Sequence, residues 1–91
     1  MADSTEDQEN FVLTPRHVAA ARALLELTQA QLADAAGVAE GTIKRFEARK
    51  GSLRPTRLAA IRDALRRRGV EFYNGNAPGV RLRPEKVSIP R

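Results

Sequence analysis

Cysteine is absent from this sequence of 91 residues, and histidine occurs once, at His17. Without cysteine, the chain can form neither a disulfide framework nor a thiolate metal site. With one histidine, we expect no histidine-built metal site and no Ser-His-Asp triad. A glycine-rich phosphate loop and a carboxylate pair in an apolar setting are also missing, and we expect no sizeable cleft in so small a domain. We therefore predict no metal, no cofactor and no enzymatic activity.

Long apolar runs are missing as well, because no stretch approaches the roughly 18 residues that a membrane span requires. The first ten residues, MADSTEDQEN, are polar and acidic, which is unlike a signal peptide. These two absences predict a protein with no membrane partner and a cytoplasmic location.

Positive charge is plentiful but unevenly distributed. The formal net charge is +5, yet residues 1–13 contain four acidic residues and no Lys or Arg, so the remaining residues carry +9. A folded region this basic is expected to meet phosphate groups or another polyanion. The alternative is a charged surface that serves only solubility, and we favour nucleic acid.

The two ends of the chain lack the periodic apolar pattern of folded elements. Residues 1–13 are predicted to be a disordered acidic leader. The leader could instead lie weakly over the basic surface as an internal mimic of phosphate, but we favour a solvated segment. Residues 84–91 are predicted to be a flexible tail. Between these ends we place a helical domain at 14–69 and a β-hairpin at 70–83.

The domain is predicted to open with a helix from about Pro15 to Glu26. Thr14 is a favourable N-cap, and proline suits the first helical position because no backbone donor is needed there. The apolar face of this helix carries Val18, Ala21 and Leu25. His17 falls outside that face, so we expect its side chain to be exposed or to face phosphate.

Residues 27–49 are predicted to form two short helices joined by a tight turn. Thr28 is followed three residues later by Gln31, which is the spacing of a capping box. Gly37 supplies the left-handed conformation in which helices often end. The apolar face of the second helix carries Val38, Ile43 and Phe46. A short buried helix, a glycine turn and a helix with a polar outer face form a helix-turn-helix pattern.

A final helix is predicted from Pro55 to Arg67 or Arg68, ended by Gly69. Apolar and polar residues then alternate on both sides of the turn-forming segment 74–79, which predicts a β-hairpin. An isolated hairpin is marginally stable, so it must pack on the helices or on a second copy. Its edges, or the outer face of the final helix, could hold a homodimer together. We therefore predict a mainly α fold with a short C-terminal β-hairpin.

The stretch LTQAQLADAAGV followed by GTIKRFE resembles the Cro/C1-type helix-turn-helix family, also called the XRE family of phage and bacterial regulators. The resemblance extends in pattern over roughly Pro15 to Leu65. The family-typical positions are Gln29, Leu32, Ala33, Gly37, Val38, Ile43 and Glu47. The resemblance implies a lambda-repressor-like domain of four to five helices that binds double-stranded DNA as a transcriptional regulator. Arg22 and Glu47 resemble a family pair that joins the first helix to the recognition helix, which is a structural role.

The N-terminal part of the second helix of a helix-turn-helix faces base edges in the major groove. The candidates for base reading are therefore Arg45, Thr42, Lys44 and Glu40. Arg45 is the strongest, because a guanidinium can bond O6 and N7 of guanine together. Thr42 could touch a thymine methyl or a phosphate, and Lys44 could instead meet a phosphate at the groove edge.

Phosphate contacts are predicted on both sides of the recognition helix. Gln29 resembles the family glutamine that bonds a backbone phosphate, and Thr28 lies beside it at the start of the same helix, where free N–H groups attract anions. Arg49 and Lys50 follow the recognition helix. Contacts of this kind determine the position of the protein along the duplex and supply most of the affinity, which therefore depends strongly on salt concentration.

Three positions depart from the family pattern. Ala39 replaces the usual Ser or Thr cap of the recognition helix. Gly41 removes a side chain from a reading position, and Glu40 places a carboxylate close to DNA phosphates. Beside a regulator that binds a two-fold operator as a homodimer, a second hypothesis therefore stays open. The fold could be a protein-binding module, an antiactivator or antitoxin that sequesters another transcription regulator.

Overall fold

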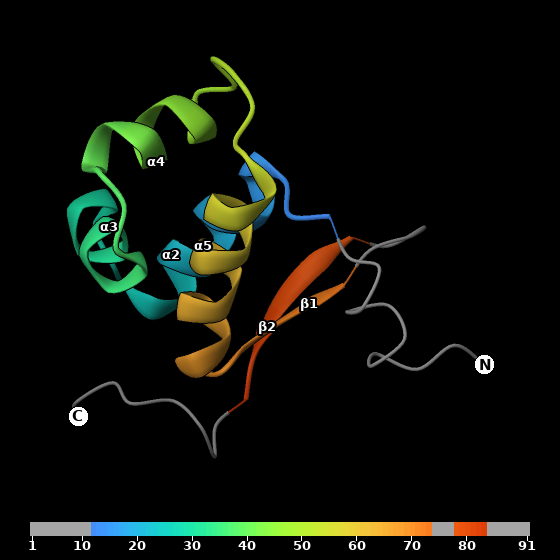
Figure 1. The fold of residues 1–91 in the computed structure, drawn as a ribbon. Coiled ribbons are helices and arrows are strands. Elements are labelled where there is room, and N and C mark those ends of the chain that lie inside the picture. Colours follow the sequence, from blue (N-terminus) through green and yellow to red (C-terminus); the bar gives the residue numbers. More distant parts are fainter. Residues whose placement is uncertain (1–11, 74–77, 84–91) are drawn as a thin grey trace.

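A computed structural model of the chain describes residues 12–73 and 78–83 (Figure 1). Within these residues the elements are α2 (Pro15–Leu25), α3 (Gln29–Ala36), α4 (Glu40–Glu47), α5 (Pro55–Arg67), β1 (Val70–Tyr73) and β2 (Gly79–Leu82). The prediction of a mainly α fold with a short C-terminal β-hairpin is confirmed. The predicted leader up to residue 11 and the predicted tail at 84–91 lie outside the described residues.

One apolar core joins the helices to the hairpin. The largest fully buried side chains come from α2, α3, α4, α5 and β1, and they are Val18, Leu32, Ile43, Ile61, Leu65 and Phe72. In Figure 1 the hairpin lies on one side of the helices, with β2 packed on α2 and β1 on α5, while α3 packs on both α4 and α5. Leu13, which the sequence analysis placed in the leader, is also buried in this core.

Helix α2 starts with a side-chain cap and ends on a strained residue. The Thr14 hydroxyl accepts a hydrogen bond from the backbone N–H of His17 at 3.2 Å, and Pro15 occupies the first helical position, both as predicted. At the other end Glu26 caps the helix in the left-handed conformation, with φ of 57°. A residue with a Cβ adopts this conformation at a cost of about 1 kcal/mol or more.

Replacing Glu26 with glycine is expected to raise the free energy of unfolding by about 0.5–1 kcal/mol, because glycine reaches the left-handed region without strain. The substitution also removes a carboxylate from a helix C-terminus, where the helix dipole disfavours negative charge. Glu26→Gln is the matched control, since it removes the charge and keeps the strain. Urea unfolding should give a higher free energy of unfolding for Glu26→Gly than for Glu26→Gln. Equal values for the two variants would contradict the assignment of strain to Glu26.

His17 corrects one prediction, because its side chain is neither exposed nor phosphate-facing. It is 4% exposed. Its Nδ1 accepts from the Thr14 hydroxyl at 2.7 Å and from the Thr14 N–H at 3.3 Å, and its Nε2 donates to the Tyr73 carbonyl at 3.0 Å. The ring also meets Phe72 edge-on, with centroids 5.9 Å apart. The hairpin covers this side of α2, and helical periodicity cannot indicate that.

The hairpin is antiparallel, with Val70 opposite Leu82 and Phe72 opposite Val80, so its apolar residues share the face toward the helices. This alternation is as predicted, with β2 beginning at Gly79. On the other face the Glu71 carboxylate accepts from the Tyr73 hydroxyl at 3.0 Å and from Arg81 Nε at 3.1 Å. Arg83 lies 3.1 Å from the same carboxylate. One acidic side chain therefore holds both strands together.

Glu71 links the stability of the hairpin to pH. Burial would raise the pKa of this carboxyl, but hydrogen bonds from Arg81 and Tyr73, with the charges of Arg81 and Arg83, lower it below its usual value. A lowered folded-state pKa contributes stability that is present above the unfolded-state value of about 4.3 and is lost as pH falls through the folded-state value.

Glu71→Gln is therefore expected to lower the free energy of unfolding by about 1–2 kcal/mol at pH 7 and to change it little at pH 3. Asp63→Asn is the control, because that carboxylate is 49% exposed and its pair with Arg62 is superficial. The test is urea unfolding of both variants between pH 3 and pH 7. A loss that is equal at both ends of this range would contradict the ionic role of Glu71.

Candidate nucleic-acid interface

The turn between α3 and α4 is built by local signals. Thr28 Oγ1 accepts from the N–H of Gln31 at 3.0 Å, while Gln31 Oε1 accepts from the N–H of Thr28 at 2.9 Å, which is the predicted capping box. Gly37 ends α3 in the left-handed conformation with φ of 71°, also as predicted. Ala39 provides no side-chain cap to α4. The position of α4 therefore depends on packing more than on its own N-cap.

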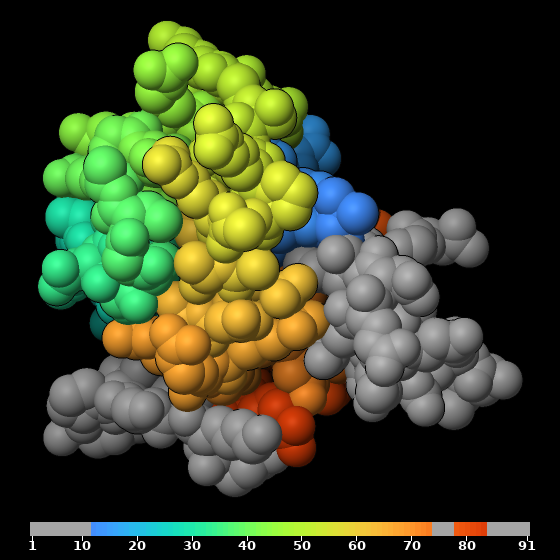
Figure 2. Space-filling model, viewed as in Figure 1, coloured from blue at the N-terminus to red at the C-terminus, as the bar shows by residue number. Residues whose placement is uncertain are grey.

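The two faces of α4 differ sharply. Ile43 and Phe46 are buried in the core. The side chains at the predicted reading positions lie on the opposite side: Glu40, Lys44 and Arg45 are exposed, Gly41 is bare, and Thr42 is half-buried. Figure 2 shows the residues that follow α4, in yellow-green, projecting at one end of the molecule. The fold thus presents the polar face of α4 outward.

Glu40 and Lys44 are one helical turn apart and form an ion pair, with 3.5 Å between Glu40 Oε2 and Lys44 Nζ. Both side chains are about half exposed or more, so the pair is weak. Two of the four predicted reading side chains are therefore turned toward each other. Arg45 makes no hydrogen bond or ion pair with another described residue, so its guanidinium is available.

Arg22 and Glu47 are brought together from α2 and α4. Arg22 Nε lies 2.7 Å from Glu47 Oε2, and Arg22 Nη2 lies 2.8 Å from Glu47 Oε1. The third guanidinium nitrogen donates to the carbonyl of Leu27 at 2.9 Å. Hydrogen bonding to Glu47 raises the pKa of Arg22, which outweighs the opposing effect of burial. This two-pronged pair fixes the angle between α4 and the rest of the domain.

Gln29 joins the same cluster, because its Nε2 donates to Glu47 Oε1 at 3.1 Å. An amide nitrogen has two hydrogens, so Gln29 keeps one for an outside acceptor. The hydroxyl of Thr28, in contrast, is already used by the capping box. Gln29, a predicted phosphate contact, therefore forms one hydrogen-bonded unit with the predicted structural pair of Arg22 and Glu47. The sequence had not indicated this connection.

A family model described as helix-turn-helix, of the Cro/C1 or XRE type, matches residues 18–72, which is more than half of the chain. The chain belongs to the Cro/C1-type helix-turn-helix family. The family is one of DNA-binding regulators. A comparison with curated proteins finds no match.

Several cations of this helix-turn-helix domain were missed by sequence reasoning. Arg16 starts α2, Arg54 precedes α5, and Arg57 lies in the first turn of α5; all three are exposed. None of them makes a hydrogen bond or ion pair within the described residues. Their positions at helix starts, where basic side chains are disfavoured by the helix dipole, were the available signal.

Two of these cations lie beside predicted phosphate contacts, because Arg57 lines a groove with Lys50 and Arg16 lines another with Arg49. A groove of about 350 Å³ separates α4 from the loop that follows it, and its basic lining residues are Arg45, Lys50 and Arg57. Arg49, exposed and in the left-handed conformation with φ of 61°, directs its side chain to the other side of the loop. Basic side chains therefore flank the C-terminal half of α4 on both sides.

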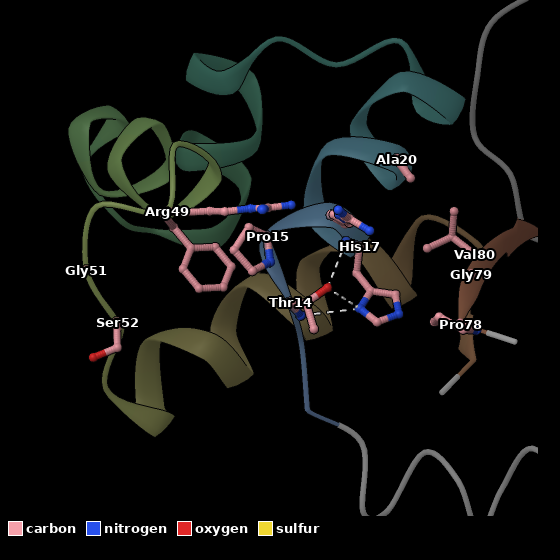
Figure 3. A pocket seen from close by; sticks show the side chains of 12 residues that line it. Thr14, Pro15, His17, Ala20, Arg49, Gly51, Ser52, Pro78, Gly79 and Val80 are labelled. Atoms are coloured by element: carbon pink, nitrogen blue, oxygen red, sulfur yellow. Dashed lines mark hydrogen bonds between the residues drawn. The ribbon is translucent and has the colours of Figure 1, made fainter. Parts of the chain in front are cut away.

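A second, larger groove of about 940 Å³ lies between the start of α2, the α4–α5 loop and the start of β2 (Figure 3). The expectation of no sizeable cleft was therefore wrong. The reason is the hairpin, which packs on α2 and provides a wall that a helix-turn-helix alone lacks. Across residues 12–73 and 78–83, no three His, Asp or Glu side chains are grouped to hold a metal ion, and no helix is long and apolar enough to cross a membrane.

Proposed function

We propose that the protein is a transcriptional regulator that binds double-stranded DNA with α4 in the major groove. The observation that carries this proposal is the gathering of exposed cations around α4, none of them paired with another described residue: Arg45, Arg49, Lys50 and Arg57. Phosphates on both sides of a major groove would meet such a distribution of charge. Gln29 and the free N–H groups at the start of α3 would add a phosphate contact on the other side of α4.

Base reading in this proposal depends mainly on Arg45. Gly41 offers no side chain, and a Cβ placed there would meet nothing within 4 Å, so the gap is open. Glu40 and Lys44 are paired with each other. Thr42, half-buried, can contribute a methyl or hydroxyl contact. We infer a short recognition code, in which one guanine contact supplies much of the discrimination.

A short code favours pairing of two copies on a two-fold site. Two domains one helical turn of DNA apart, about 34 Å, would double both base and phosphate contacts. The two-stranded sheet has two outer strand edges, and α5 has an outer face, so either could join the copies. We therefore propose a homodimer and place its contact at the hairpin or at α5.

The test combines mass measurement by size-exclusion chromatography with binding to the promoter fragment of the protein's own operon at 50 mM and 200 mM salt. A dimer that shifts this fragment, with affinity falling by about 10³-fold or more between the two concentrations for six or more phosphate contacts, is the expected result. Equal affinity for every duplex would remove the specificity part of the proposal. Absence of binding to any duplex at low salt would overturn it.

A protein-binding module is the second candidate. It is favoured by the uncapped start of α4 at Ala39, by the bare position at Gly41 and by the ion pair that occupies Glu40 and Lys44. Another transcription regulator would then be the partner, and the protein would act as an antiactivator or antitoxin. A monomer that gives no duplex shift at low salt would select this candidate over the first.

A further inference from the structure

The larger groove is apolar along most of its length. Its walls include Pro15, Ala20, Phe46 and Val80, together with the ring of His17. Among the described residues its charged lining consists of Arg16 and Arg49, with no Asp or Glu. A groove of this composition fits a ligand that is apolar in one part and anionic in another.

Arg16 and Arg49 are both exposed, and neither makes a hydrogen bond or ion pair with another described residue. Figure 3 shows the Arg49 side chain extending from the end of α4 toward the first turn of α2. Arg49 has a left-handed backbone, with φ of 61°, and its side chain lines the groove. Two guanidinium groups with no carboxylate partner among the described residues therefore face the same groove.

In place of the solvated leader that the sequence alone favoured, we propose that this groove binds the acidic segment immediately before it, residues 3–11. The segment contains four carboxylates, no Lys or Arg, and a terminal Phe11, so it combines negative charge with one large apolar side chain. Phe11 is only three residues before Thr14, which is part of the groove wall. Glu9 is five residues before Thr14, a reach of about 17 Å in an extended chain.

Weak contacts are sufficient to hold the segment in the groove, because the segment is covalently joined to the groove wall at Thr14. Each exposed ion pair contributes little, but a segment attached to the groove wall has an effective concentration in the millimolar range. One consequence rests on the proposed function. Arg49 is also a predicted phosphate contact, so a segment that occupies Arg49 competes with DNA and lowers the affinity of the free protein.

Docking can be tested without DNA, because the chain has no native cysteine and accepts a single nitroxide label through Ser4→Cys. Strong paramagnetic broadening is expected at the backbone amides of Ala20, Ser52 and Gly79 in the full chain. Little is expected at Asp34 on α3. At 1 M salt, where the Debye length is about 3 Å, broadening at the groove should fall by about half or more.

The labelled variant R16Q/R49Q should lose the groove broadening to a similar extent, whereas R67Q, which removes an exposed arginine at the end of α5, should keep it. Both arginines of the groove are exposed, so circular dichroism and the thermal midpoint should stay unchanged and verify the fold. Broadening that is the same with and without Arg16 and Arg49, or that is missing from the groove, overturns the proposal.

Competition with DNA is tested by neutralising Asp3, Glu6, Asp7 and Glu9 to Asn and Gln in the full chain. Affinity for duplex DNA at low salt should rise about three- to tenfold, and the gain should disappear at high salt. The effect of net charge is controlled by single neutralisations: Glu9→Gln removes one carboxylate inside the segment, and Glu26→Gln, which removes one outside it, should have a much smaller effect. An unchanged affinity overturns the competition. If no duplex binds at all, the proposed function fails, while the label experiment still decides docking.

Discussion

Replacement of Arg22 by leucine is expected to lower the free energy of unfolding by about 3 kcal/mol, because it leaves a buried carboxylate without its main partner. The Glu47 side chain is 9% exposed. It would keep one hydrogen bond, from Gln29, and lose both bonds from the guanidinium. The carbonyl of Leu27 would lose its donor as well. Urea unfolding at neutral pH measures the loss.

The reverse change, Glu47→Leu, is expected to be milder, at about 2 kcal/mol, since the Arg22 side chain is 22% exposed and can be hydrated. The double variant Arg22→Leu/Glu47→Leu should recover part of the loss seen with Arg22→Leu alone. Arg62→Leu is the surface control, and a loss of less than about 1 kcal/mol is expected there. If Arg22→Leu is no worse than this control, the pair does not fix α4 as we argue.

Arg45→Ala is expected to reduce affinity for the preferred duplex by about tenfold to a hundredfold and to relax discrimination at one base pair. The guanidinium is exposed on α4 and has no partner among the described residues. The neighbouring positions offer little to replace it, because Gly41 is bare and Glu40 pairs with Lys44. Fluorescence anisotropy with duplexes that vary each base pair in turn measures both effects.

Arg57→Ala is the matched comparison, because Arg57 is also basic and exposed and lines the groove beside α4. As a phosphate contact it should weaken binding to all duplexes alike. It should also make the slope of log affinity against log salt shallower by about one. If Arg45→Ala instead weakens binding to all duplexes alike, Arg45 contacts phosphate, and the proposal that it discriminates between bases is wrong.

The elements that sequence reasoning predicted well depend on a few neighbouring residues. Thr14 and Thr28 cap helices by bonding N–H groups three residues away, and Gly37 ends α3 through its own backbone freedom. The alternation of the hairpin likewise expresses the two-residue period of a strand. Each signal is contained in a short window, so it can be recognised without knowledge of the fold.

Features that depend on distant segments were not predictable in this way. His17 bonds the carbonyl of Tyr73, 56 residues later, so its burial depends on where the hairpin packs. The groove beside α2 exists for the same reason. Glu26 and Arg49 adopt left-handed conformations that their side chains do not favour, because helix packing determines where the chain must turn.

The sequence by itself determined the helix-turn-helix, the capped ends of α3 and the excess of positive charge. Only the tertiary structure decided which charges are available. Glu47 pairs with Arg22, and Glu71 is shared by Arg81 and Arg83, whereas Arg45 makes no ion pair within the described residues. Ion pairing falls off over a few ångströms, and those distances are set by the packing of elements far apart in sequence.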